Sequence, residues 1–196
     1  MSRSLRALLI ILLVASCGGG RNYSAPRNLD NACSILEQRK GYARAFRATE
    51  RKWGVPMHVQ MATIYQESKF VANARTPLRF KLGVIPVGRQ SSAYGYSQAL
   101  DGTWEEYQRA TGKWSAKRDN IRDATDFMGW YMAQSRDQLG IPLTDARGHY
   151  LAYHEGRTGY RRGSHNSKSW LLRVSQEVAD RSVTYQAQLA NCRAAR

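Results

Sequence analysis

Apolar side chains recur every three or four residues along most of the chain, which is the spacing of amphipathic helices. The first such run begins at Ser34, which forms a capping-box pattern with Glu37. The run continues to Trp53 and is ended by Gly54. We therefore expect one helix over residues 34–53.

A second helix is predicted to follow at once, because Pro56 is well placed at a first helical position. Met57, Met61 and Ile64 share one face of this helix, and Glu67 follows three residues after Ile64, beside that face. The pattern therefore predicts a glutamate at a helix end, at the border of an apolar surface.

The pattern then changes over residues 73–92, where prolines and glycines interrupt a short alternation at 79–82. This alternation predicts a small strand or hairpin. A second capping box at Thr103 predicts a helix toward Gly112. Apolar periodicity predicts three more helices, over 121–139, roughly 145–154 and 171–189. The expected fold is mainly α, with one small irregular or β-containing lobe.

The N-terminus has the pattern of an exported lipoprotein. Two arginines precede an apolar stretch, 7–14, that is too short to span a bilayer as a helix. The small residues directly before Cys17 resemble the bacterial lipobox, in which the signal is cleaved before a cysteine that carries lipid. We expect a signal peptide over 1–16, lipid attachment at Cys17 and a flexible tether over 17–30. An ordinary secretory signal with an incidental cysteine is the alternative.

Export also bears on the other two cysteines and on the charge. An oxidising compartment favours a disulfide between Cys33 and Cys192, with two buried free thiols as the alternative.

The formal net charge is +15 and falls to +13 without the two arginines of the signal. Such a charge favours acidic partners, and export argues against nucleic acid. The remainder, 31–196, suits a single domain with a sizeable core.

Glu67 is the candidate reactive residue. Cleavage of a glycosidic bond needs a carboxylic acid that is still protonated near neutral pH, whereas an ordinary glutamate titrates near pH ~4.3. Desolvation by the apolar face and the negative end of the helix dipole both favour the protonated form of Glu67. The four histidines include no helix-spaced pair with a glutamate between them, and no glycine-rich phosphate loop follows a strand. We therefore expect neither a metal nor a cofactor.

Three short motifs resemble the soluble lytic transglycosylase (SLT) family of lysozyme-like enzymes. That family ends its catalytic helix with Glu-Ser and a nearby Phe, which Glu67, Ser68 and Phe70 match. Its Gly-Leu-Met-Gln segment is matched by residues 95–98, which read Gly-Tyr-Ser-Gln. Its Ala-Tyr-Asn-x-Gly segment is matched by residues 152–156, which read Ala-Tyr-His-Glu-Gly. The motifs occur in the family's order.

The resemblance covers roughly residues 46–174 and implies a lysozyme-like fold and a reaction. The implied reaction cleaves the β-1,4 bond between N-acetylmuramic acid and N-acetylglucosamine of peptidoglycan and forms a 1,6-anhydro sugar, with Glu67 as the single acid and base. Tyr153 would orient or hydrogen-bond near Glu67, and Ser68 would support it. Residues expected to bind substrate or to support the site are Ser68, Tyr94, Gly95, Gln98, Tyr153 and His154.

The chain departs from the family pattern in three places. Tyr96 and Ser97 replace Leu-Met, which makes the contact expected there more polar and aromatic. His154 replaces the usual Asn, and residues 76–90 lengthen the segment between Glu67 and the second motif. We expect a divergent branch with an altered cleft lobe.

Two other functions remain open. A hydrolytic muramidase would add a second carboxylate, for which Asp101 and Glu155 are the candidates. A non-catalytic cell-wall-binding lipoprotein would use Trp104, Trp114 and Trp130 for sugar stacking.

The expected partner in each case is the glycan strand of peptidoglycan, whose peptide carboxylates suit a basic protein. We expect a monomer held by its lipid anchor at the periplasmic face of the outer membrane, because Gly18 and Gly19 provide no acidic inner-membrane retention signal.

Overall fold

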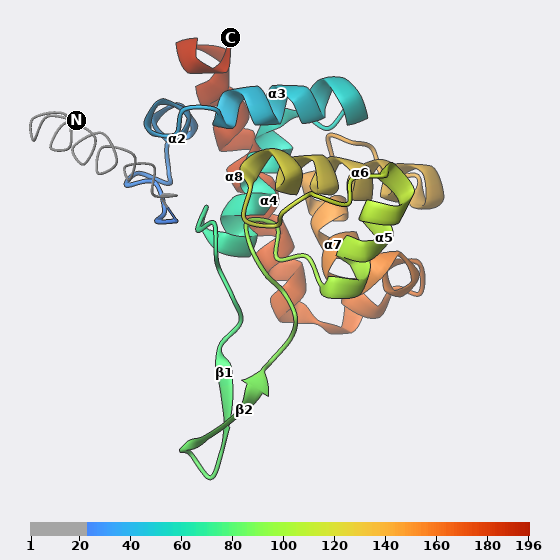
Figure 1. Ribbon diagram of the computed structural model, residues 1–196. Helices are drawn as coiled ribbons and strands as arrows, with labels where there is room; N and C mark the ends of the chain where they lie inside the picture. Colours follow the sequence, from blue (N-terminus) through green and yellow to red (C-terminus); the bar gives the residue numbers. More distant parts are fainter. Residues whose placement is uncertain (1–22) are drawn as a thin grey trace, which may run out of the picture.

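The computed structural model describes residues 23–196, which form a mainly helical domain with one small antiparallel sheet, as predicted (Figure 1). The signal peptide expected over 1–16 and the lipid attachment expected at Cys17 lie outside the described residues. The helices are α2 (Ala32–Gln38), α3 (Tyr42–Trp53), α4 (Met57–Ser68), α5 (Asp101–Thr111), α6 (Ile121–Leu139), α7 (Ala146–Arg161) and α8 (Ser169–Ala190). The strands are β1 (Leu78–Lys81) and β2 (Ile85–Arg89).

The single helix predicted over 34–53 is wrong, because the chain forms two helices there. Asn31, not Ser34, caps the first: its side-chain oxygen accepts a 2.8 Å hydrogen bond from the Ser34 backbone N–H. The chain then turns at Gly41, whose φ of 97° places it in the left-handed region. That turn separates α2 from α3.

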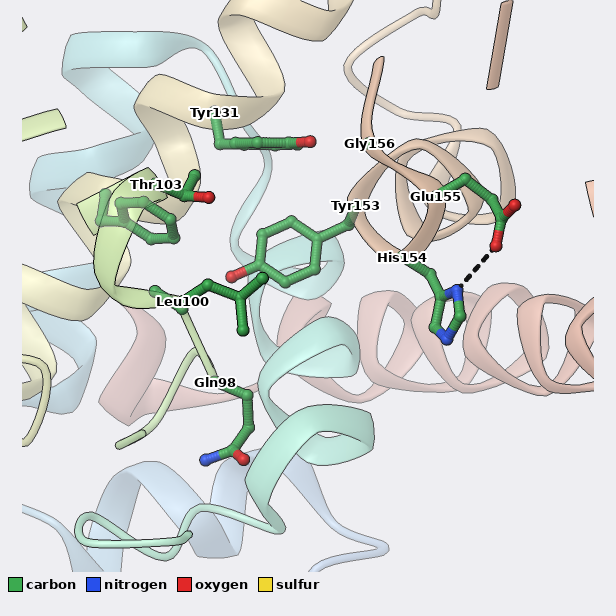
Figure 2. A pocket seen from close by; sticks show the side chains of 10 residues that line it. Gln98, Leu100, Thr103, Tyr131, Tyr153, His154, Glu155 and Gly156 are labelled. Atoms are coloured by element: carbon green, nitrogen blue, oxygen red, sulfur yellow. Dashed lines mark hydrogen bonds and ion pairs between the residues drawn. The ribbon is translucent and has the colours of Figure 1, made fainter. Parts of the chain in front are cut away.

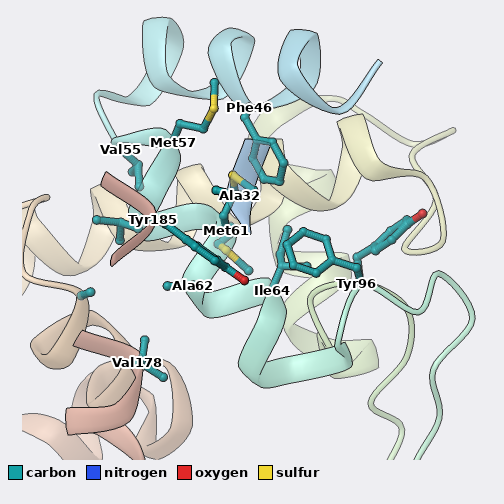
Figure 3. Packing of buried hydrophobic residues seen from close by; sticks show 14 of the residues in the cluster. Ala32, Phe46, Val55, Met57, Met61, Ala62, Ile64, Tyr96, Val178 and Tyr185 are labelled. Atoms are coloured by element: carbon teal, nitrogen blue, oxygen red, sulfur yellow. The ribbon is translucent and has the colours of Figure 1, made fainter. Parts of the chain in front are cut away.

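The main core surrounds α4, which packs against α3, α7 and α8 (Figure 3). Met61 and Ile64 of α4 are fully buried, as the apolar face predicted. Phe46 of α3 and Tyr185 of α8 close this core from two sides. A second cluster lies between α5 and α6 and consists of Ala99, Trp104, Tyr107, Phe127, Trp130 and Tyr131. Because α4 is held by other helices along most of its length, its C-terminal end has a defined position.

Two predicted helices have different bounds in the structure. The capping box expected at Thr103 is not used, since α5 begins at Asp101, whose backbone N–H donates to the Ser92 hydroxyl at 3.1 Å. The helix expected over 145–154 continues to Arg161, with a break at Gly156 (φ 71°, ψ 158°). The helix predicted over 121–139 is confirmed as α6.

The predicted hairpin is confirmed as β1 and β2, with Phe80 opposite Pro86 and Lys81 opposite Ile85. It extends away from the helical body, within the segment 76–90 that was expected to lengthen this part of the chain (Figure 1). Every residue of both strands is exposed.

The disulfide predicted between Cys33 and Cys192 is confirmed, and it joins α2 to the chain that follows α8. The described part of the expected tether lies against the domain: the Tyr23 carbonyl oxygen accepts a hydrogen bond from the Ala72 N–H at 3.2 Å, and Arg39 donates to the Ser24 carbonyl oxygen at 2.6 Å. Over residues 23–196, no helix is both long enough and apolar enough to cross a membrane.

Candidate active site

Glu67 lies in the last turn of α4, where the helix ends in a constrained turn. Lys69 caps the helix in the left-handed conformation (φ 50°, ψ 35°), and the next residue, Phe70, is left-handed as well (φ 60°). Two consecutive non-glycine residues with positive φ are uncommon and must be stabilised by their surroundings. Phe70 is fully buried and stacks on Tyr42 with 6.1 Å between ring centroids. Packing of Phe70 therefore fixes the direction in which the chain leaves Glu67.

Ser68 joins this helix end to the second motif. Its hydroxyl shares its single hydrogen between the Tyr96 carbonyl oxygen, at 2.8 Å, and the Ile64 carbonyl oxygen, at 3.3 Å. Ser68 therefore supports the site through the backbone of the neighbouring loop, and these bonds do not involve the Glu67 carboxyl group.

The loop of the second motif, 94–98, approaches other backbone very closely. Gly95 has φ +80°, and a Cβ added there would lie 2.2 Å from the Arg118 carbonyl oxygen. Gln98 is also left-handed (φ 49°), and its side-chain amide donates to the carbonyl oxygens of Gly95 (2.8 Å) and Ala74 (3.0 Å). The Gln98 side chain thus holds its own loop in place while it lines the adjoining cavity.

Neither of the two aromatic residues of this loop lines the adjoining cavity. Tyr96 points into the core, where its hydroxyl bonds that of Tyr42 at 2.8 Å, so it does not provide the polar aromatic contact expected in the cleft. Tyr94 is not among the cavity-lining residues; its ring lies beneath the guanidinium group of Arg75 at 4.1 Å.

Tyr153 on α7 connects the loop and the glutamate. Its hydroxyl donates to the Ser97 carbonyl oxygen at 2.6 Å, and its ring contacts Tyr131 with 5.0 Å between centroids. Burial raises the pKa of Tyr153 well above its ordinary value, and the nearby negative charge of ionised Glu67 raises it further. Tyr150, three residues earlier on the same helix, also has a pKa raised by burial and by the charge of Glu67.

The environment of Glu67 favours a protonated carboxyl group. Desolvation by burial raises its pKa from an ordinary 4.5 to about 8, against the opposing effect of the positive charge on Lys69. Within the described part of the chain, no ion pair or hydrogen bond engages this carboxyl group. Glu67 is therefore mostly protonated at neutral pH, as a general acid requires.

A cavity of about 270 Å³ is lined in part by Tyr153, whose ring lies between Tyr131 and Leu100 (Figure 2). A second cavity, of about 230 Å³, adjoins the end of α4 and includes Lys69. Glu67 lines neither cavity, but its charge acts on Tyr153 in the first and on Lys69 in the second. The first cavity is lined by Gln98, Ala99, Leu100, Thr103, Phe127, Tyr131, Tyr153, His154, Glu155 and Gly156.

Comparison with known protein families gives a match over residues 5–192 to the transglycosylase SLT domain. The chain belongs to that family. The family assignment carries a lytic transglycosylase-type, peptidoglycan-degrading function and the peptidoglycan glycan strand as substrate. No curated protein matches the chain.

The second carboxylate that a hydrolytic enzyme would need is not free in this SLT domain. The Glu155 carboxylate accepts hydrogen bonds from Lys168 (2.7 Å), Ser164 (2.5 Å) and His154 (2.9 Å), and the bond from Lys168 contributes most to lowering its pKa to about 2. Asp101 forms a 2.7 Å ion pair with Arg118 in the first turn of α5. Both carboxylates are therefore engaged by other side chains.

The tryptophans and histidines of the SLT domain are placed differently from the sequence-based expectation. Trp104 and Trp130 are buried in the second cluster, so neither can stack on a sugar as the non-catalytic reading required, whereas Trp114 is exposed. His154 lies at the rim of the first cavity, and its ring meets the half-exposed ring of Trp170 edge-on at 5.1 Å. Among residues 23–196, no group of three metal-ligating side chains could hold a metal ion.

Several residues that line the first cavity or contact its surroundings were not found by sequence reasoning. Phe127 and Tyr131 were assigned only to a core stripe, and they serve the core and the cavity together. Tyr150 carried a usable signal, because it precedes Tyr153 by one helical turn and so shares its face. Trp170 carried none, since its contact with His154 depends on how α8 packs against α7.

Proposed function

We propose that Glu67 is the single acid and base of a lytic transglycosylase that cleaves the β-1,4 bond between N-acetylmuramic acid and N-acetylglucosamine. The observation that carries this proposal is the desolvated, unpaired Glu67 carboxyl group, whose pKa is raised to about 8. The ion-paired state of Glu155 and Asp101 supports it, because a one-carboxylate mechanism needs no second free acid.

In the first step, Glu67 donates its proton to the glycosidic oxygen as the bond from that oxygen to C1 of the muramic acid breaks. The oxygen of the 2-acetamido group stabilises the positive charge that develops at C1. Because the leaving group departs as a neutral alcohol, the proton carried by Glu67 lowers the barrier to departure. Glu67 is left as a carboxylate in a poorly solvated position, which makes it a strong base.

In the second step, the Glu67 carboxylate takes the proton of the 6-hydroxyl group of the same sugar. The 6-oxygen then forms a bond to C1 and closes the 1,6-anhydro ring. Glu67 returns to its protonated form, and no water is consumed. The first cavity suits a sugar unit of the glycan strand, since it combines the aromatic rings of Phe127, Tyr131 and Tyr153 with the polar side chains of Gln98 and Thr103.

Digestion of purified peptidoglycan sacculi tests this function. A protein lacking residues 1–22 retains Tyr23 and Ser24, which contact the domain. Mass spectrometry of its products is expected to show anhydro ends, and Glu67→Gln is expected to reduce product formation by about 10²–10⁴-fold. Products with reducing ends, heavier by one water, would instead identify a hydrolytic muramidase. Equal activity of the Gln variant and the parent protein would exclude Glu67 as the acid.

We also propose, from the N-terminal pattern, that the enzyme is a lipoprotein attached through Cys17 at the periplasmic face of the outer membrane. Incorporation of a labelled fatty acid into the full chain, and its loss in Cys17→Ser, tests the attachment. Persistence of the label in Cys17→Ser would contradict it.

A further inference from the structure

The hairpin formed by residues 76–91 carries a surface that the proposed reaction does not use. Six large apolar side chains on it are exposed, and the tip is the most exposed part, at 84% for Leu82 and 76% for Val84. Exposed apolar groups concentrated on one projecting element mark an interaction surface. The six residues are Leu78, Phe80, Leu82, Val84, Ile85 and Val87.

The hairpin has a defined shape and projects away from the helical body (Figure 1). Its base is closed by a hydrogen bond from the Thr76 hydroxyl to the Ser91 carbonyl oxygen at 3.0 Å and by one from Arg89 to the Thr76 carbonyl oxygen at 2.6 Å. The apolar tip is therefore held at a distance from the catalytic helix, and its side chains do not contribute to either core cluster.

The charge of the hairpin has one sign. Arg79, Lys81 and Arg89 lie among the apolar residues, and there is no aspartate or glutamate anywhere from residue 68 to residue 100. A partner that combines an apolar interior with an anionic surface satisfies both features. An anionic phospholipid bilayer is such a partner, because apolar side chains enter the acyl region while long cationic side chains extend to the phosphates.

The distribution of apolar groups on the two faces also favours lipid. Residues directly opposite each other in an antiparallel pair share a face, and successive residues alternate. Phe80, opposite Pro86, therefore lies on one face, and Ile85, opposite Lys81, lies on the other. A protein surface or a second copy of the chain would cover one face and leave the other in water. Lipid surrounds both.

We propose that the tip of the hairpin inserts into the surface of an anionic phospholipid bilayer and so adds a second membrane contact, independent of any N-terminal anchor. Insertion would hold the domain in a fixed orientation at the membrane and limit the glycan strands that its cleft can reach.

A local probe tests this in the full chain. Val84→Cys, labelled with an environment-sensitive fluorophore in a Cys17→Ser background, reports on the tip alone, because Cys33 and Cys192 are disulfide-bonded. The matched control is Val183→Cys on α8, a valine of similar exposure (66%) on the helical body. With vesicles of equal parts phosphatidylglycerol and phosphatidylcholine, we expect a blue shift and higher emission at position 84 and no change at position 183.

Two further variants separate the apolar contribution to membrane binding from the electrostatic contribution. Leu82→Ser is expected to weaken the response at position 84 at least about tenfold in vesicle concentration. Replacing Arg79 and Lys81 with glutamine is expected to weaken it on the anionic vesicles but not on phosphatidylcholine alone. An unchanged signal at position 84 while the chain sediments with vesicles would overturn the proposal. A signal that grows with protein concentration in the absence of lipid would also overturn it, because it identifies a second copy of the chain as the partner. A signal produced by sacculi but not by vesicles would do the same, because it identifies the cell-wall polymer as the partner.

Discussion

The hydroxyl group of Tyr153 donates its hydrogen to the carbonyl oxygen of Ser97, at 2.6 Å, and thereby joins α7 to the loop that carries Gln98. A phenol has one hydrogen to donate, so this bond leaves none for Glu67. The role inferred from the family resemblance, in which Tyr153 orients Glu67, is thus indirect in this structure. Tyr153 fixes the loop, and it lies close enough to Glu67 for the charge of the ionised acid to raise its pKa.

Tyr153→Phe removes that bond and keeps the ring that contacts Tyr131. We expect the free energy of unfolding to fall by about 1 kcal/mol, the typical value of one hydrogen bond. We expect kcat/KM on sacculi to fall about tenfold, because the loop and cavity lose their alignment with Glu67. Tyr160→Phe is the matched control, since Tyr160 stacks on His165 away from the cavity. An unchanged kcat/KM in Tyr153→Phe would reduce the bond to a purely structural role.

The pH dependence of activity follows from the raised pKa of Glu67. Because the proton on Glu67 is needed in the first step, kcat/KM should decline as the pH rises through about 8. Lys69 lowers this pKa by its positive charge, so Lys69→Gln should move the decline to higher pH. Lys40→Gln, at an exposed lysine between α2 and α3, should leave the profile in place. A shift to lower pH in Lys69→Gln would show that another group controls the decline.

The same group makes stability depend on pH in a defined direction. An acid whose pKa is raised on folding binds its proton more tightly in the folded protein. Its contribution is complete below the unfolded value near 4.5 and is lost as the pH rises through the folded value of about 8. Over that interval, the wild-type protein should lose up to about 1.4 kcal/mol of unfolding free energy per pH unit relative to Glu67→Gln.

Urea unfolding at a series of pH values measures this difference. Glu105→Gln, at an exposed glutamate on α5, is the matched control. A pH-independent difference between Glu67→Gln and wild type would mean that the Glu67 carboxyl group is solvated and has an ordinary pKa.

Local signals in the sequence predicted the elements but not the bonds that set their ends. The stripe over 121–139 was sufficient, since Asn120 caps α6 from the adjacent position and Gly140 ends it. The start of α5 was missed because Asp101 donates its N–H to Ser92, nine residues earlier and outside any local capping pattern. The break between α2 and α3 was missed because the apolar stripe continues across Gly41.

The same limit applies to the candidate site. Residue type and order made Glu67, Gln98 and Tyr153 candidates, because each stands in a short motif. The directions of side chains were not accessible in this way. Tyr96 and Ser97 are neighbours in the second motif, yet the Tyr96 side chain lies in the core, whereas the Ser97 carbonyl oxygen accepts a hydrogen bond from Tyr153. The loop can take this course because Gly95 and Gln98 both adopt left-handed conformations.

The close approach at Gly95 gives a stringent test of that loop. Gly95→Ala would bring a methyl group 2.2 Å from the Arg118 carbonyl oxygen, and that oxygen already accepts a hydrogen bond from the Tyr96 N–H at 3.1 Å. Because backbone must move on both sides, we expect an unfolding free energy lower by about 3 kcal/mol or more. The displaced loop would also carry Gln98 and the Tyr96 carbonyl that Ser68 binds, so activity should fall even where the variant is folded.

Gly112→Ala separates this steric effect from the cost of the left-handed backbone itself. Gly112 has φ +70° at the end of α5, and a Cβ added there would meet no atom within 4 Å. The Gly112→Ala substitution should therefore lower the unfolding free energy by only about 1 kcal/mol and leave the activity unchanged. Equal losses of unfolding free energy in the two variants, measured by urea unfolding, would show that the backbone at Arg118 can move away from the added methyl group at little energetic cost. The position of the loop beside Glu67 would then have to be maintained chiefly by the hydrogen bonds of Ser68, Gln98 and Tyr153.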